Sequence, residues 1–248
     1  MSVLERWRHI SNMVENEDYV TVEEFCTRLG VSEATIRRDL TAMEGRGMLE
    51  RFRGGAQKVK AIYIPEHSAG EISHRLMERR DEKIKIARRA AEMIGDGDYV
   101  FIDSSSTTYF MIDFIMAKDV TILTNSILIM PKLLEKNMRG YITGGFIDKC
   151  SESVIPDDYT VAMQSMNFNK TFIGTYGISE KTGYTTYGTA EGNFKRNIIA
   201  QSEQTFVLAD MSKFDRSAFF SYASLDACTL ITDGRNSITD NMEKVIIC

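Results

Sequence analysis

The hydroxyl-rich run DSSSTT, from Asp103 to Thr108, lies between an apolar stretch, YVFID, and the start of a helical pattern. At such a junction free backbone N–H groups, the helix dipole and the hydroxyls converge, and together they bind a phosphate group without a lysine. Hydroxyl-rich helix caps without any ligand are also common. The run therefore favours an anion site, and a plain helix cap is the alternative.

Polar and glycine residues also follow later apolar runs. TNS follows VTIL, GG follows the YIT run, and DMSK follows TFVLA. Ligands of α/β sheets bind beyond the carboxyl ends of the strands, so we expect these residues to line one site. The predicted ligand-binding residues are Asp103, Ser104, Ser105, Ser106, Thr107, Thr108, Thr124, Asn125, Ser126, Gly144, Gly145, Lys195, Asp210 and Lys213.

Some of these residues have two interpretations. Lys195 follows Glu191 by four residues on a predicted helix. It forms either an exposed ion pair, contributing roughly 0.2–0.5 kcal/mol, or a contact to the ligand's phosphate. Lys213 directly follows a predicted strand and is the stronger cationic candidate. Asp103 and Asp210 either hydrogen-bond ligand hydroxyls or cap backbone amides.

A second group of chemistry-bearing residues lies in the first quarter of the chain, where GVSEATIRRDL precedes a basic glycine hairpin. Ser32 is placed to cap a helix whose outward face carries small, hydroxyl and guanidinium groups. Such a face approaches base edges, while its arginines reach phosphates or guanine. MLERFR and AQKVK, around Gly54-Gly55, predict a basic wing that contacts the DNA backbone. The predicted DNA-binding residues are Ser32, Ala34, Thr35, Arg37, Arg38, Thr41, Arg51, Arg53 and Lys58.

Apolar residues at helical spacing predict three short helices that position this surface. The first covers roughly residues 2–16 and the second about 22–29, after the segment NEDY breaks the pattern. Gly30 follows, where a left-handed turn is least costly. Asp39, in the third helix, lies toward the buried edge and is expected to pair with a neighbouring arginine. A plain three-helix bundle with solvated arginines is the alternative, and the basic wing favours DNA binding.

Residues 59–70 mix proline, glycine and polar side chains and predict a linker. It separates a winged helix-turn-helix domain at 1–58 from a larger domain at 71–248. Residues 71–94 predict one helix, which either carries a ligand signal between the domains or simply covers the sheet. Beyond it, helical patterns alternate with six apolar runs, YVFID, VTILT, YIT, KTFIG, TFVLA and TLITD, each of which predicts a strand. Strands alternating with helices indicate a mostly parallel α/β sheet covered on both faces.

Composition and charge limit the possible functions. The 248 residues are 43% hydrophobic and 26% charged, as in an ordinary globular protein. The net charge is −5, but residues 36–60 hold seven basic and three acidic residues, so they carry +4 and leave −9 elsewhere. The four cysteines form no CxxC pair and the three histidines lie outside the predicted strand ends, so we expect no metal or other cofactor. The first residues lack a signal-peptide core and no apolar run spans a bilayer, which predicts a cytoplasmic protein without a membrane partner.

The ordered segments resemble the DeoR family of bacterial transcriptional regulators over nearly the whole chain. They are VTVEEFCTRLGVSEATIRRDLTAMEGRGMLERFRGG, DGDYVFIDSSSTT, LTNS, TGG, TTYGTAEGNFKR, LADMSKF and LITD. The resemblance implies a regulator, usually a repressor, that senses a phosphorylated sugar or a related metabolite. It also implies a C-terminal domain similar in fold to ribose-5-phosphate isomerase. Three positions depart from the family: Arg53 replaces a common histidine, Ser105 a usual glycine and Tyr176 a frequent aspartate.

We therefore expect a homodimer or homotetramer that binds the double-stranded operator of a sugar-metabolism operon, with an affinity controlled by a phosphorylated sugar effector. The main alternative is a sugar-phosphate isomerase or deaminase with an accessory N-terminal domain, in which Asp103, Glu191 and Asp210 supply carboxylates. A recognition helix and a wing have no use in an isomerase, so we expect no enzymatic activity. A third hypothesis, a constitutive architectural DNA-binding protein, leaves the hydroxyl-rich strand ends without a role.

Overall fold

The chain forms two compact units, residues 1–63 and 64–248, which are described separately. The computed structural model describes residues 3–17, 19–44, 49–52, 54–57, 72–149, 151–156, 163 and 165–248. The predicted linker, residues 59–70, lies outside the described residues, as do Arg53 and Lys58 of the predicted wing.

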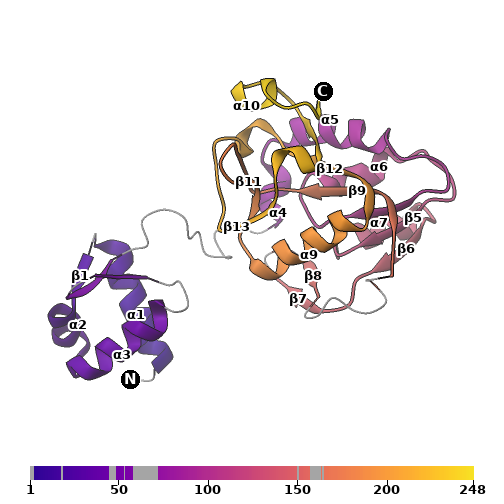
Figure 1. The fold of residues 1–248 in the computed structure, drawn as a ribbon. Helices are drawn as coiled ribbons and strands as arrows, with labels where there is room; N and C mark the ends of the chain where they lie inside the picture. Colours follow the sequence, from indigo (N-terminus) through magenta and orange to yellow (C-terminus); the bar gives the residue numbers. More distant parts are fainter. Residues whose placement is uncertain are drawn as a thin grey trace. The chain divides into compact units, whose positions relative to one another are not determined.

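The first unit contains the three predicted helices and the predicted wing (Figure 1). Its helices are α1 Val3–Asn16, α2 Val22–Leu29 and α3 Glu33–Glu44. Its strands are β1 Tyr19–Thr21, β2 Glu50–Phe52 and β3 Gly55–Gln57, paired antiparallel in the order β1-β3-β2. The strand β1 was not predicted, because three residues are too few to show an apolar period.

Apolar side chains from all three helices meet in one core in this unit. Ile10 of α1, Phe25 of α2 and Ile36 of α3 are fully buried in it. Thr21 and Glu24 begin α2 with a reciprocal capping box, which satisfies two amides that the helix start leaves free. Together these contacts hold α3 with its opposite face toward solvent.

The second unit is built on a seven-stranded sheet in the order β15-β14-β12-β9-β4-β5-β6, and every neighbouring pair is parallel. The strands are β4 Tyr99–Ile102, β5 Thr121–Thr124, β6 Arg139–Ile142, β9 Phe168–Gly174, β12 Ser202–Leu208, β14 Thr229–Thr232 and β15 Val245–Ile247. This arrangement confirms the predicted α/β class. The edge strand β15 was not predicted.

Helices cover both faces of this sheet (Figure 1). Successive strand residues point to opposite faces, so Ile102 packs into one core and Phe101 into the other. The first core is closed by helices whose bounds are α5 Arg80–Ala91, η2 Thr108–Phe110, α6 Met111–Phe114 and α7 Ile129–Glu135. The second is closed by α9 Thr189–Ala200, through Phe194 and Ile198.

Shorter elements surround the sheet. Three strands form an antiparallel sheet in the order β10-β11-β13, with bounds β10 Gly177–Ser179, β11 Gly183–Thr186 and β13 Phe220–Ala223. A hairpin pairs β7 Phe146–Asp148 with β8 Ser153–Ile155. The remaining elements are η3 Met211–Lys213, η4 Leu225–Ala227 and α10 Ser237–Asp240.

The helix predicted over residues 71–94 is interrupted in the structure. It consists of α4 Ile72–Met77 and α5 Arg80–Ala91, and between them Arg79 takes a left-handed conformation with φ 47°. A non-glycine residue in this conformation is uncommon, and the charged helical pattern of this segment does not predict it. The prediction of one continuous helix was therefore wrong.

Candidate DNA-binding surface and ligand pocket

The outward face of α3 carries most of the predicted DNA-binding residues. Ala34, Arg37, Arg38 and Thr41 are exposed on it. At the start of α3 the amide of Thr35 donates to the Ser32 hydroxyl at 3.4 Å, and the two hydroxyls lie 3.0 Å apart. The face therefore combines small, hydroxyl and cationic groups at the beginning of an exposed helix.

The arginines of this surface differ in how they are engaged. Arg37 forms an exposed ion pair with Glu33 at 2.6 Å. Arg51 of the wing donates to the Thr41 hydroxyl at 2.6 Å, which ties β2 to α3. The side chain of Arg38 makes no hydrogen bond or ion pair within the described part of the chain. It is therefore the side chain of α3 most available to DNA.

A buried carboxylate on the inner face of α3 ties this helix to α1. Asp39 accepts hydrogen bonds from Arg6 and, at 3.0 Å, from the indole N–H of Trp7, both on α1. The predicted pairing of Asp39 with an arginine is thus confirmed, but its partner lies 33 residues away in sequence. Burial alone would raise the pKa of Asp39, but the hydrogen bonds from Arg6 and Trp7 outweigh it and lower the pKa.

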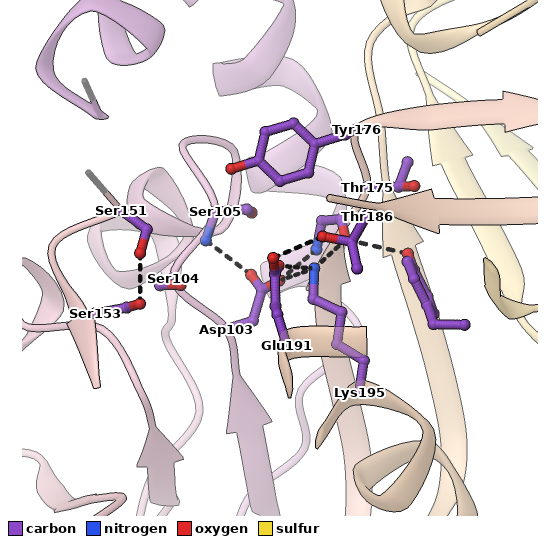
Figure 2. Close-up of polar contacts among 12 residues, drawn as sticks. Asp103, Ser104, Ser105, Ser151, Ser153, Thr175, Tyr176, Thr186, Glu191 and Lys195 are labelled. Atoms are coloured by element: carbon purple, nitrogen blue, oxygen red, sulfur yellow. Dashed lines mark hydrogen bonds and ion pairs between the residues drawn. The ribbon is translucent and has the colours of Figure 1, made fainter. Parts of the chain in front are cut away.

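A polar pocket lies in the second unit, where β4 and β9 end (Figure 2). Its lining residues are Arg75, Asp103, Ser104, Ser105, Ser106, Thr107, Ser151, Gly174, Thr175, Tyr176, Glu191, Lys195, Leu208 and Lys213. Seven of the predicted ligand-binding residues are among them: Asp103, Ser104, Ser105, Ser106, Thr107, Lys195 and Lys213. The pocket therefore lies where a parallel sheet normally binds its ligand.

Asp103 organises the floor of the pocket. Its Oδ1 accepts from the amide of Ser105 at 2.9 Å and from the hydroxyl of Thr108 at 3.0 Å. Its Oδ2 accepts from the amide of Gly174 at 2.7 Å, which joins the loop after β4 to the end of β9. By contrast, the amides of Ser106 and Thr107 donate to no acceptor among the described residues. Hydrogen bonds to Asp103 therefore fix the conformation of the loop, and the amides of Ser106 and Thr107 remain available to bind an anion.

Lys195 lies at the centre of this network (Figure 2). Its Nζ is 2.8 Å from Glu191, 3.3 Å from Asp103 and 2.8 Å from the carbonyl oxygen of Gly174. Burial would lower the pKa of Lys195, but the carboxylates of Glu191 and Asp103 outweigh it and raise the pKa. The ion pair considered from sequence therefore exists, but it is buried rather than exposed and includes a second carboxylate.

Ser105 occupies the space next to Gly174. Its hydroxyl lies 2.9 Å from that of Thr108 and accepts from the Thr108 amide at 3.1 Å, so it caps η2. A Cβ placed on Gly174 would meet the Ser105 Cβ at 2.3 Å. The serine at this usual glycine position is accommodated because its neighbour on β9 has no side chain.

The other predicted ligand-binding residues lie outside the pocket lining. Thr124 and Ser126 are buried, and the Thr124 hydroxyl accepts from the Ser126 amide at 3.0 Å. Asn125 is buried, and its side-chain amide donates to the Ser104 hydroxyl at 3.4 Å, so it supports the loop after β4 without lining the pocket. The remaining residues outside the lining are Thr108, Gly144, Gly145 and Asp210.

Two of these residues have a clear structural role. At Gly145, with φ 140°, a Cβ would lie 2.1 Å from the carbonyl oxygen of Ile155, so the glycine permits a close backbone contact. Asp210 caps η3, with its Oδ1 2.9 Å from the Ser212 amide. Both Asp103 and Asp210 therefore cap backbone amides, one of the two roles considered for them.

Several pocket residues were not predicted. Arg75 comes from α4 and Ser151 from the β7–β8 turn, neither of which is a strand end of the main sheet. Thr175 and Tyr176 directly follow β9, so the rule that selected the other strand ends would have found them. Arg75 Nη1 donates to the Tyr176 hydroxyl at 2.9 Å.

The described residues contain no cluster of three His, Cys, Asp or Glu side chains that could bind a metal ion. Within that same part of the chain, every helix is too short or too polar to cross a lipid bilayer.

Comparison with known proteins gives matches over nearly the whole chain. Residues 6–61 match the family model of the DeoR-like helix-turn-helix domain, and residues 78–234 that of the DeoR C terminal sensor domain. An uncharacterized HTH-type transcriptional regulator, FruR of Bacillus subtilis, is 35% identical over 98% of this chain and 96% of its own length. A lactose phosphotransferase system repressor of Streptococcus mutans is 29% identical over 97% of this chain and 95% of its own. Among solved structures, ribose 5-phosphate isomerase A of Methanocaldococcus jannaschii is similar with a TM-score of 0.41 and 15% identity, over 55% of each chain.

Proposed function

Since this chain belongs to the DeoR family of helix-turn-helix transcriptional regulators, we propose that it represses a sugar-metabolism operon and releases its operator when a phosphorylated sugar binds the second unit. One observation carries the proposal. The same chain presents an exposed arginine on a helix suited to the major groove and a polar pocket with free amides at the strand ends. A relative named as a repressor of a lactose phosphotransferase system supports the sugar assignment.

For DNA binding, we assign α3 to the major groove and the β2–β3 wing to the phosphate backbone. Arg38 supplies base or phosphate contacts, and Arg51 anchors the wing to α3 through Thr41. A second copy of the chain would supply the second recognition helix, so we propose a homodimer or homotetramer in the cytoplasm. The division into 1–58, a linker at 59–70 and 71–248 is part of the same proposal.

For ligand binding, the amides of Ser106 and Thr107 and the hydroxyls of the same loop suit a phosphate. The carboxylate of Glu191 suits sugar hydroxyls, whereas that of Asp103 is occupied by the amides of Ser105 and Gly174, the Thr108 hydroxyl and Lys195. Lys195 already donates to both carboxylates and to a backbone carbonyl, so it maintains the pocket and does not act as an acid or base. We accordingly propose a sensor without enzymatic turnover.

The test of the ligand proposal is a thermal-shift panel of phosphorylated sugars and their unphosphorylated parents on the full chain. Any stabilising sugar phosphate is then added to a gel shift on the DNA upstream of the chain's own gene. We expect stabilisation by at least one phosphorylated sugar, none by its parent, and loss of the DNA complex. A panel in which no phosphorylated sugar stabilises the chain would contradict the sensor role.

The test of the DNA surface is Arg38→Ala. Losing one arginine that contacts a base or phosphate costs about 1–3 kcal/mol, so operator affinity should fall about tenfold or more. The sugar-phosphate affinity should not change, because Arg38 is in the other unit. Arg28→Ala on α2, where the exposed arginine is paired with Glu17, is the matched control and should lose much less. Equal operator affinity for Arg38→Ala and the wild type would exclude α3 as the recognition helix.

A further inference from the structure

Arg75 on α4 is a buried arginine with no carboxylate partner among the described residues. The residue is only 9% exposed and lines the ligand pocket. Its guanidinium lies 5.3 Å from the centre of the Tyr176 ring, and Nη1 donates to the hydroxyl of the same tyrosine. Nε is buried without a hydrogen-bond partner, and no carboxylate among the described residues lies within ion-pair distance. Such burial is costly, because it leaves both a charge and a donor unsatisfied.

Further cations surround Arg75. Lys83 is 2% exposed, and its Nζ donates to the carbonyl oxygen of Arg75. Burial lowers the pKa of Lys83 to about 8, and the charges of Lys213 and Arg75 contribute to this, although Asp210 opposes them. Burial also lowers the pKa of Lys213, again with a contribution from Arg75. The carboxylates of Asp210 and Glu78 oppose these cations, but among the described residues neither lies within ion-pair distance of Arg75.

Tyr176 adds no negative charge to balance these cations. Its hydroxyl accepts from Arg75 but stays neutral, because burial raises the pKa of Tyr176 far above its ordinary value. Among the described residues, Arg75 thus has a neutral hydroxyl and no carboxylate as its partner.

We propose that Arg75, together with Lys213, binds the phosphate of the effector, and that this contact orients the sugar in the pocket. The inference rests on the proposed function, in which this pocket binds a phosphorylated sugar. A guanidinium with a free N–H matches phosphate oxygens, and a dianion neutralises two cations at once. The free amides of Ser106 and Thr107 line the same pocket and add further donors.

The other charged residues of the lining determine which way the sugar points. Asp103 and Glu191 contact Lys195, so the charge of this lysine is already balanced by two carboxylates. Carboxylates repel a phosphate but accept hydrogen bonds from hydroxyls. The phosphate therefore lies toward Arg75, and the sugar hydroxyls lie toward Glu191.

The location of Arg75 connects the ligand to the start of the second unit. α4 is the first described element of this unit, and the left-handed Arg79 separates it from α5. Because the helix is interrupted there, α4 can change position without moving α5 as a rigid extension. A phosphate that attracts Arg75 thus acts on the element nearest in sequence to the DNA-binding unit.

Calorimetric titration of the full chain with glucose 6-phosphate, fructose 1-phosphate and inorganic phosphate tests the proposal. Arg75→Gln should weaken binding of the phosphorylated ligands about tenfold or more, as expected for a lost hydrogen bond to a charged group. Arg75→Lys keeps the charge but not the planar fork, so its loss should be smaller. Arg89→Gln, at a partly exposed arginine of α5 paired with Glu92, is the matched control and should bind like the wild type.

The melting temperature without ligand separates this role from a structural one. Removing an unpaired buried charge should leave the Tm of Arg75→Gln unchanged or raise it, whereas a structural arginine would lower it on removal. Wild-type affinity in Arg75→Gln would overturn the inference and leave the proposed function intact. If Arg75→Gln does not fold, unchanged affinity in Arg75→Lys overturns the inference in the same way. Failure of all three ligands to bind the wild type would contradict the proposed function itself, and the inference with it.

Discussion

Ser105 and Gly174 share one small space at the floor of the ligand pocket. The serine hydroxyl caps η2 there, and the absence of a side chain on Gly174 makes room for it. We expect Gly174→Ala to lower the free energy of unfolding by about 2 kcal/mol or more, because its Cβ overlaps the Ser105 side chain. Thermal and urea unfolding of the full chain measure this effect. Gly144→Ala is the control, since nothing lies within 4 Å of a Cβ at that position.

The same pair predicts a rescue. Ser105→Gly removes the atoms that collide with an alanine at position 174, so adding it should restore most of the stability lost in Gly174→Ala. A double-mutant cycle should therefore show a coupling energy between the two positions. If the two changes simply added, the clash would not be the cause of the instability. The usual glycine at position 105 would then have to be explained in another way.

At the scale of elements, the orientation of α3 depends on the buried pairing of Asp39 with Arg6 and Trp7 of α1. Since the folded-state pKa of Asp39 is lowered, its ionised form stabilises the folded state at every pH above its ordinary value, about 3.9. This stabilisation is lost as the pH falls through the lowered folded-state value. We therefore expect the first unit to lose stability in acid below about pH 4.

Trp7 makes this prediction measurable in the full chain, because it is the only tryptophan. Its fluorescence follows unfolding of the first unit alone. At neutral pH, Asp39→Asn should cost about 3 kcal/mol, since it leaves Arg6 buried without a countercharge, and the variant should lack the acid-dependent loss. Glu33→Gln, at the exposed pair with Arg37, is the control and should change stability by only a few tenths of a kcal/mol, roughly. An unchanged acid profile in Asp39→Asn would assign the acid sensitivity to other groups.

The elements that sequence predicts are those long enough to show a period. The helices α1, α2, α3 and α9 were predicted for this reason, as were six strands of the main sheet. The strands β1 and β15 are three residues long and, unlike the equally short β2 and β3 of the wing, do not flank a glycine turn. The break at Arg79 depends on one backbone angle, which leaves no sequence pattern. The loop after β4 was found because strand ends are the expected ligand site. Arg75 was missed because α4 reaches the pocket from outside the sheet.

At the scale of the whole molecule, charge is distributed unevenly along the chain. Residues 36–60 carry +4 and the rest carries −9, so the body of the protein is repelled by DNA while one surface is attracted. Contacts to several phosphates also release counterions, which makes operator binding fall steeply with salt. Operator affinities can therefore be compared with one another only when they are measured at the same salt concentration.

Effector control requires that the two sites be coupled, and coupling of this kind is reciprocal. If a sugar phosphate lowers operator affinity by some factor, the operator must lower sugar-phosphate affinity by the same factor, typically about 5–150-fold. We expect this equality when ligand Kd is measured with and without saturating operator, and operator Kd with and without saturating ligand, at the same salt. Arg38→Ala is the control, because a chain that no longer binds operator should show one ligand Kd whether or not DNA is present. If neither ligand changed the Kd of the other, the pocket and α3 would act independently, and the ligand tested would not be the effector.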